Sequence, residues 1–214
     1  MKKDLMELVF ILDRSGSMGG LESDTIGGYN SMLQKQKEKP GAVNVTTVLF
    51  DDHYELLHDR IDMNEVSLLS GKDYYVRGTT ALLDAIGKTI TKMVNSQRKT
   101  SKDQQGKQVL FVIITDGMEN ASKEYSYKHI KKMVDLQKEK YGWEFIFLGA
   151  NIDAAETAGR FGINENRAVN YHGDSKGTQL NYEVLSETVM HMRTSASIDD
   201  LWKEKIDEDY KSRK

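Results

Sequence analysis

Three oxygen-bearing side chains, Asp13, Ser15 and Ser17, stand at alternate positions just after the apolar run 8–12. This run is short, rich in branched and aromatic residues and followed by a Ser/Gly cluster, which is typical of a buried strand that ends in a loop. One carboxylate and two hydroxyls are hard oxygen donors, the ligands that Mg²⁺ and Mn²⁺ prefer. The segment therefore indicates a divalent-cation site, although the same pattern also suits an ordinary turn or a helix cap.

Two later segments favour the metal site over the turn. Residues 77–80 supply two threonines just before an amphipathic helical pattern. The run 108–115 is a second buried strand, and Asp116 follows it directly. Ligands of open α/β sheets bind beyond the carboxyl ends of the strands, where the strand order reverses. If the two strands are neighbours at that point, Asp13 and Asp116 share one cleft.

Together these three segments resemble the von Willebrand factor type A domain and its metal-ion-dependent adhesion site (MIDAS). In that family the first loop reads Asp-x-Ser-x-Ser, the second loop supplies a Thr, and the third supplies an Asp after an apolar strand. The resemblance covers most of the chain up to about residue 149. It implies that the metal ligands are Asp13, Ser15, Ser17, Thr80 and Asp116. Thr80 is preferred to Thr79 because of its spacing to the helical pattern, and Thr79 is the fallback.

The resemblance also implies a function. It predicts a protein–protein interaction module in which Mg²⁺ or Mn²⁺ keeps one coordination position open for an Asp or Glu carboxylate of a partner protein. The helix expected to begin near Thr80 points its positive N-terminal end at the same place, which would favour that anion. Intracellular relatives with this domain often work beside AAA+ ATPases or in stress and assembly complexes, so a partner of that kind is a further implication.

Strand and helix patterns alternate along the chain. Strands are predicted at 6–12, 43–50, 54–61, 108–115, 143–149 and 167–171, and helices at 21–39, 81–95, 126–141, 153–161 and 176–192. This alternation predicts an α/β fold: a Rossmann-like, doubly wound sheet, mostly parallel with one antiparallel edge strand, and helices on both faces. Residues 63–73 are expected to be irregular or a short helix, and 96–107 a polar connection. We expect a single domain at 1–195 and a charged C-terminal tail or helix extension at 196–214.

The composition excludes several classes of function. The net charge of −3 gives no general attraction to nucleic acid or to anionic membranes. The chain has no cysteine, which excludes disulfides and thiol chemistry. No apolar stretch approaches the roughly 18–20 residues that span a bilayer. The first seven residues do not resemble a signal peptide, so we expect a cytoplasmic protein.

Two alternative interpretations remain: a structural module that has the fold and binds metal weakly, and an enzyme. A Mg²⁺-dependent phosphohydrolase or phosphotransferase would use Asp13 as its nucleophile. Aspartate phosphotransferases usually carry a second acidic residue two places on, where this chain has Ser15, and no phosphate-binding lysine accompanies the loop. We therefore expect the chain not to be an enzyme.

Polar residues beside the three loops have two possible roles. Arg14 and Arg77 either help to bind an anionic ligand or, as we expect, are exposed and form structural salt bridges. Glu119 and Asn120 either line the cleft or stabilise a turn. The segment 149–151 either forms a wall of the cleft, or Asn151 or Asp153 caps the following helix.

Overall fold

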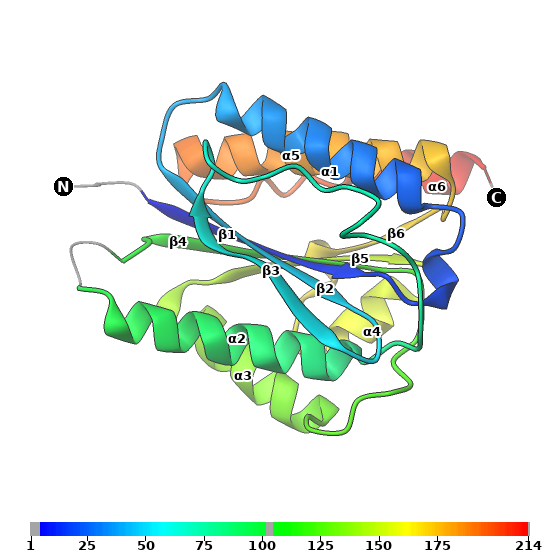
Figure 1. The fold of residues 1–214 in the computed structure, drawn as a ribbon, viewed down its shortest axis with the longest axis horizontal. Coiled ribbons are helices and arrows are strands. Elements are labelled where there is room, and N and C mark those ends of the chain that lie inside the picture. Colours follow the sequence, from blue (N-terminus) through cyan, green and yellow to red (C-terminus); the bar gives the residue numbers. More distant parts are fainter. Residues whose placement is uncertain (1–4, 102–104, 214) are drawn as a thin grey trace.

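The computed structural model describes residues 5–101 and 105–213, which form one six-stranded sheet with helices on both faces (Figure 1). The strands are β1 (Met6–Asp13), β2 (Val43–Phe50), β3 (Tyr54–Asp62), β4 (Gln108–Thr115), β5 (Glu144–Ala150) and β6 (Ala168–Tyr171). The helices are α1 (Glu22–Lys37), α2 (Leu82–Lys99), α3 (Tyr127–Tyr141), α4 (Ala154–Arg160), α5 (Ser175–Ser195) and α6 (Glu204–Ser212). Residues 1–4, 102–104 and 214 lie outside the described part, and they include the middle of the connection predicted at 96–107.

The order of the strands confirms the predicted doubly wound sheet. They lie in the order β3-β2-β1-β4-β5-β6, and every neighbouring pair is parallel except β2 and β3. The chain moves outward from β1 to β2 and β3, then continues at β4 on the other side of β1. The strand order therefore reverses between β1 and β4, and ligands bind outside the carboxyl ends of the strands at such a point.

Side chains of β1 alternate between the two halves of the core. Leu8, Phe10 and Leu12 belong to the hydrophobic cluster under α1, α5 and α6, whereas Val9 and Ile11 belong to the cluster under α2, α3 and α4. Figure 1 shows these two groups of helices on opposite faces of the sheet. Because β1 is central and covered on both faces, all of its residues are buried, which explains its nearly continuous apolar sequence.

Two helices extend beyond their predicted ends. Helix α2 continues to Lys99, so the first part of the predicted 96–107 connection is helical. The added residues include Gln97 and Arg98, which are good helix formers but show no apolar periodicity. Helix α5 likewise continues to Ser195 and ends at Ala196, whose φ of 59° lies in the left-handed region. Residues 63–73 contain turns and no helix.

The chain beyond residue 195 packs against the sheet. Ile198, Trp202 and Ile206 belong to the same hydrophobic cluster as β1, and the Trp202 indole donates a hydrogen bond to the Asn166 carbonyl at 2.8 Å. Ile206 is the buried residue of the otherwise polar α6. The segment thus contributes to the core, while the domain boundary at 195 remains a prediction. No helix within the described ranges is long and apolar enough to cross a membrane.

Candidate functional site

The first loop of the candidate site begins where β1 ends. Asp13 is fully buried. Its carboxylate accepts hydrogen bonds from the Ser15 backbone N–H at 2.7 Å and from the Thr115 hydroxyl at 2.5 Å. The Tyr74 hydroxyl donates to the Asp13 carbonyl, also at 2.5 Å. Contacts from β4 and from the loop before α2 therefore hold Asp13 in one position.

Three hydroxyl groups meet beside this carboxylate. The Oγ atoms of Ser15 and Ser17 lie 3.1 Å apart, and the Thr80 hydroxyl donates to Ser15 Oγ at 2.9 Å. Thr80 is buried, whereas Thr79 is exposed, so the structure brings the preferred threonine and not the fallback into the cluster. Ser17 is exposed, so the cluster opens to solvent on its side.

The third loop brings Asp116 to the same edge of the sheet. Its carboxylate follows β4, the parallel neighbour of β1, and accepts a hydrogen bond from the Asn151 side-chain amide. Burial raises the pKa of the Asp13 carboxyl, and the charge of Asp116 raises it further, against the hydrogen bonds from Thr115 and Ser15. Burial also raises the pKa of Asp116 itself, against the bond from Asn151. Two buried carboxylates that repel each other are stabilised by a cation placed near both.

Gly117 connects the third loop to the hydroxyl cluster. A Cβ atom at this position would lie 2.9 Å from Ser17 Oγ and 3.2 Å from Thr80 Oγ1. Only glycine lets the backbone approach the two hydroxyls so closely. The structure therefore brings the five predicted residues together from three loops, and their donor atoms are all hard oxygens, which fit a small divalent cation.

Glu119 and Asn120 stabilise local structure next to the site. The Asn120 side-chain oxygen accepts from the Thr80 backbone N–H at 2.9 Å. The Glu119 carboxylate accepts from the Leu83 N–H in the first turn of α2 at 2.8 Å and from two N–H groups of its own loop. The positive end of α2 thus already faces a carboxylate. The attraction of this helix end for a ligand anion, which the sequence predicted, is thereby reduced.

Arg14 differs from its predicted exposure but has the predicted structural role. It is fully buried, and its guanidinium contacts the carboxylates of Asp51 at 3.0 Å and Glu55 at 2.7 Å. Arg77 pairs with the same Asp51 at 2.7 Å. Burial acts to raise the pKa of Asp51, but the hydrogen bonds from Arg77 and the His53 backbone, together with the charge of Arg14, hold it below its ordinary value. Asp51 therefore links the first and second loops to the β2–β3 turn.

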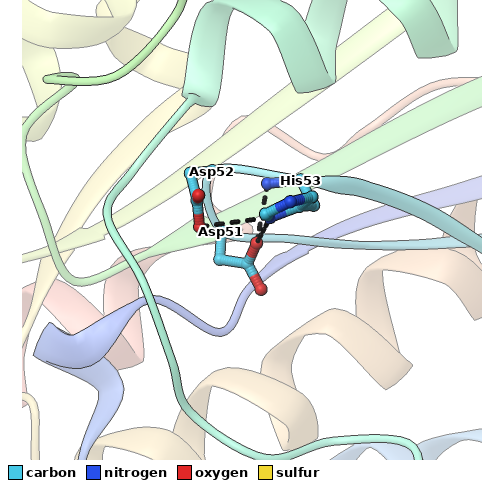
Figure 2. Close-up of side chains that lie close together, drawn as sticks. All are labelled: Asp51, Asp52 and His53. Atoms are coloured by element: carbon cyan, nitrogen blue, oxygen red, sulfur yellow. Dashed lines mark hydrogen bonds and ion pairs between the residues drawn. The ribbon is translucent and has the colours of Figure 1, made fainter.

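A second acidic group lies in that turn. Asp51, Asp52 and His53 place potential metal-ligand atoms within 4.8 Å of one another (Figure 2). Figure 2 shows the imidazole of His53 next to both carboxylates. Asp51 already neutralises Arg14 and Arg77, so it is not available to a cation as Asp13 and Asp116 are. We assign this group a structural role.

Three residues hold the site through contacts that the sequence did not reveal. Thr115 has the branched side chain expected at any strand position, and nothing in its context indicates the bond to Asp13. Asp51 had no recognisable role before Arg14 was seen to be buried. Asn151 neither caps α4 nor merely lines the site; Asp153 is the cap, and Asn151 binds Asp116. The signal that the sequence offered for this contact was an asparagine directly after a buried strand.

Comparison with known proteins agrees with this arrangement. The family model of the von Willebrand factor type A domain matches residues 7–184, which run from β1 into α5 and include all three loops. No curated protein matches the chain.

Three solved structures share the fold. The pilus adhesin SpaC from Lactobacillus rhamnosus GG has a TM-score of 0.65 and 11% identity, over 87% of this chain and 30% of its own. Proximal thread matrix protein 1 from the mussel byssus, with a zinc-occupied MIDAS motif, has a TM-score of 0.56 and 13% identity, over 88% and 46%. The ArnB paralog VWA2 from Sulfolobus acidocaldarius has a TM-score of 0.53 and 20% identity, over 87% and 45%.

At these identities the likeness concerns the fold, and the chain spans less than half the length of each of the three proteins. The family match is of another kind, because it extends over most of the chain and contains every residue of the candidate site. The chain therefore belongs to the von Willebrand factor type A domain family.

Proposed function

We propose that the chain is a metal-dependent protein-interaction module. In this proposal Mg²⁺ or Mn²⁺ binds among the side chains of Asp13, Ser15, Ser17, Thr80 and Asp116, and an Asp or Glu carboxylate of a partner protein completes its coordination. The observation that carries the proposal is the convergence of three hydroxyls between two buried carboxylates at the strand-order reversal. The mussel protein with a zinc-occupied MIDAS motif supports a divalent ion at such a site.

The spacing of the hydroxyls is compatible with a small ion. Neighbouring ligands of an octahedral Mg²⁺, with metal–oxygen distances of about 2.1 Å, lie about 3.0 Å apart. The observed separations are 3.1 Å for the Ser15 and Ser17 Oγ atoms and 2.9 Å for Ser15 Oγ and Thr80 Oγ1. These separations are ordinary hydrogen-bond distances, and the hydroxyls can become neighbouring ligands of Mg²⁺ or Mn²⁺ with little movement.

The open side of the site, more than its net charge, supports a carboxylate ligand from outside. Asp13 and Asp116 together carry −2, which a divalent ion neutralises without excess positive charge. Ser17 lies at the exposed side, where a partner's side chain can reach the ion. The end of α2 adds little attraction because Glu119 occupies it, so the metal itself is the feature that recruits an anion.

The burial of Asp13 argues against the alternative of a phosphotransferase. Asp13 has no solvent-exposed surface, and its two carboxylate oxygens each accept a hydrogen bond. A nucleophile must instead present an oxygen to the substrate within a few ångströms. We therefore propose a binding module without turnover. A location in the cytoplasm and a partner among AAA+ ATPases or stress and assembly complexes remain proposals.

A pull-down experiment tests the proposal. Immobilised chain is incubated with lysate in Mg²⁺, in chelator, and as the Thr80→Ala variant in Mg²⁺, and the retained proteins are identified by mass spectrometry. We expect the same protein to be retained by the wild type with Mg²⁺ and lost in the other two samples. Equal retention in all three would place the contact elsewhere, and hydrolysis of phosphate esters that depends on Mg²⁺ would favour the enzyme.

A further inference from the structure

Asn151 has an unusual backbone conformation directly beside the candidate metal site. It follows β5, and its φ is 54°, in the left-handed region that residues other than glycine seldom adopt. Asparagine tolerates this region better than most residues do. The conformation directs the side-chain amide to Oδ1 of Asp116, to which Nδ2 donates a hydrogen bond. The backbone of Asn151 is therefore shaped to hold one oxygen of a predicted ligand.

Gly173 lies next to the same carboxylate. A Cβ atom at Gly173 would lie 3.1 Å from Asp116 Oδ2 and 3.3 Å from Asn151 Nδ2. This glycine follows β6, whose Tyr171 pairs with Ala150 at the end of β5. The chain after β6 thus lies next to the Asn151–Asp116 pair, and a larger residue at position 173 would crowd it.

Asp116 is consequently poorly placed to bind an ion with both oxygens. Oδ1 of Asp13 accepts the Ser15 N–H and Oδ2 accepts the Thr115 hydroxyl, while Oδ1 of Asp116 accepts the Asn151 amide. Because Oδ1 of Asp116 accepts the Asn151 amide, Oδ2 is the oxygen of this carboxylate that is left to bind an ion, directly or through water. Mg²⁺ is bound in this manner, whereas Ca²⁺ favours six to eight ligands and often takes both oxygens of a carboxylate.

We propose that Asn151 is a positioning residue that sets the ion selectivity of the site. By holding Oδ1 of Asp116, it limits that carboxylate to one oxygen and thereby favours Mg²⁺ and Mn²⁺ over Ca²⁺. This inference rests on the proposed function, because it assumes that the site binds a divalent ion.

Calorimetric titration of the whole chain with Mg²⁺, Mn²⁺ and Ca²⁺ tests the role of Asn151. The Asn151→Gly variant removes the amide and keeps the left-handed backbone without strain. We expect its Mg²⁺ affinity to fall about tenfold or more, as is typical when a residue that orients a metal ligand is lost. Its Ca²⁺ affinity should stay the same or rise, so that the ratio of the two affinities falls.

Ala196→Gly is the matched control, because Ala196 also has a positive φ but lies at the end of α5. It should keep the wild-type affinity ratio. Asn151→Asp is the second variant: it retains the size and backbone preference of Asn but replaces the donor with an acceptor. We expect Asn151→Asp to gain more affinity for Ca²⁺ than for Mg²⁺.

The outcomes separate the two proposals. A wild-type chain that binds no divalent ion would overturn the proposed function. In a second outcome, the wild-type chain binds Mg²⁺ and both Asn151 variants have the same ratio of Mg²⁺ to Ca²⁺ affinity as the wild type. This outcome would overturn the role of Asn151 and leave the proposed function intact.

Discussion

At the scale of single residues, the candidate site combines two carboxylates that repel each other with hydroxyls already in place. Asp13 is buried, and its ionised form costs free energy in the metal-free fold because burial and the charge of Asp116 both disfavour it. That cost is recovered when a cation binds. The same residue is thus unfavourable for the metal-free fold and favourable for the metal-bound one.

Asp13→Asn should separate these two effects. We expect the variant to lose metal binding, at least 100-fold by calorimetry, because it removes half of the negative charge of the site. Its metal-free stability should equal or exceed that of the wild type. The Asn amide can donate to the Thr115 hydroxyl, which can turn to the Gly117 carbonyl 3.3 Å away, while the Asn oxygen keeps the Ser15 N–H. Urea unfolding measures the second quantity, and a strong loss of stability would show that Asp13 is mainly a structural acceptor.

The pH dependence of stability follows from the direction of the same pKa shift. The pKa of Asp13 in the folded chain lies above its ordinary value of 3.8, so the folded state holds this proton more tightly than the unfolded state. Without metal, the destabilisation due to Asp13 is therefore full above the folded pKa and fades as pH falls through it towards 3.8. The stability advantage of Asp13→Asn over wild type should shrink over that window in metal-free urea titrations. An advantage that stays constant from pH 7 to 4 would contradict the shift.

At the scale of elements, the site depends on how three loops are held against one another. The first loop is attached to the β2–β3 turn through Arg14 and Asp51, and the second loop is attached to the same carboxylate through Arg77. The third loop bonds Asn120 to the Thr80 backbone. The Glu119 carboxylate accepts a hydrogen bond from the Leu83 N–H in the first turn of α2. The loops are therefore ordered by contacts that do not involve the metal.

Arg14→Met tests the most buried of these contacts. Methionine approximates the length of the arginine stem but cannot pair with Asp51 or Glu55. Removing one partner of a buried ion pair typically costs about 3–5 kcal/mol. We expect the lower part of that range, because Asp51 keeps Arg77. Arg213→Met, whose ion pairs lie at partly exposed positions near the C-terminus, is the control and should cost much less in the same urea experiment.

At the scale of the whole molecule, the sheet order decides where the site lies. Strands β1 and β4 are neighbours at the reversal, and the two hydrophobic clusters fix them between helices on both faces. An ion bound at this edge is attached to two central strands and to the start of α2. Ion binding should accordingly raise the free energy of unfolding of the whole domain, and its effect should not be confined to one loop.

Thermal unfolding with MgCl₂ should show this coupling. An ion present at about 100 times its Kd adds about 2.7 kcal/mol, which raises the Tm of a domain of this size by about 5–10 °C. NaCl at matched ionic strength should leave the Tm nearly unchanged, and Asp13→Asn should not respond to MgCl₂. A wild-type Tm that is indifferent to millimolar Mg²⁺ and Mn²⁺ would remove the main support for the metal site.

Much of the fold was predictable because its signals are local. The apolar runs that became β1 and β4, and the helical periodicity before and after them, are properties of short windows of sequence. The order of Asp13, Ser15, Ser17, Thr80 and Asp116 around those runs was sufficient to nominate the site. The sequence also predicted the antiparallel edge at β2 and β3, since a short turn between two strands makes a hairpin.

The contacts that hold the site in shape were decided only by tertiary structure. Thr115 meets Asp13 across 102 positions, Arg14 meets Asp51 across 37, and Asn151 meets Asp116 across 35. No local pattern encodes such pairs, because each arises when the strand order places two chain ends at one edge of the sheet. The burial of Arg14, the use of Glu119 to close α2 and the contribution of Trp202 to the core have the same origin. The sequence alone determined which side chains could bind an ion, whereas the packing of distant segments determined which of their oxygens remain free to do so.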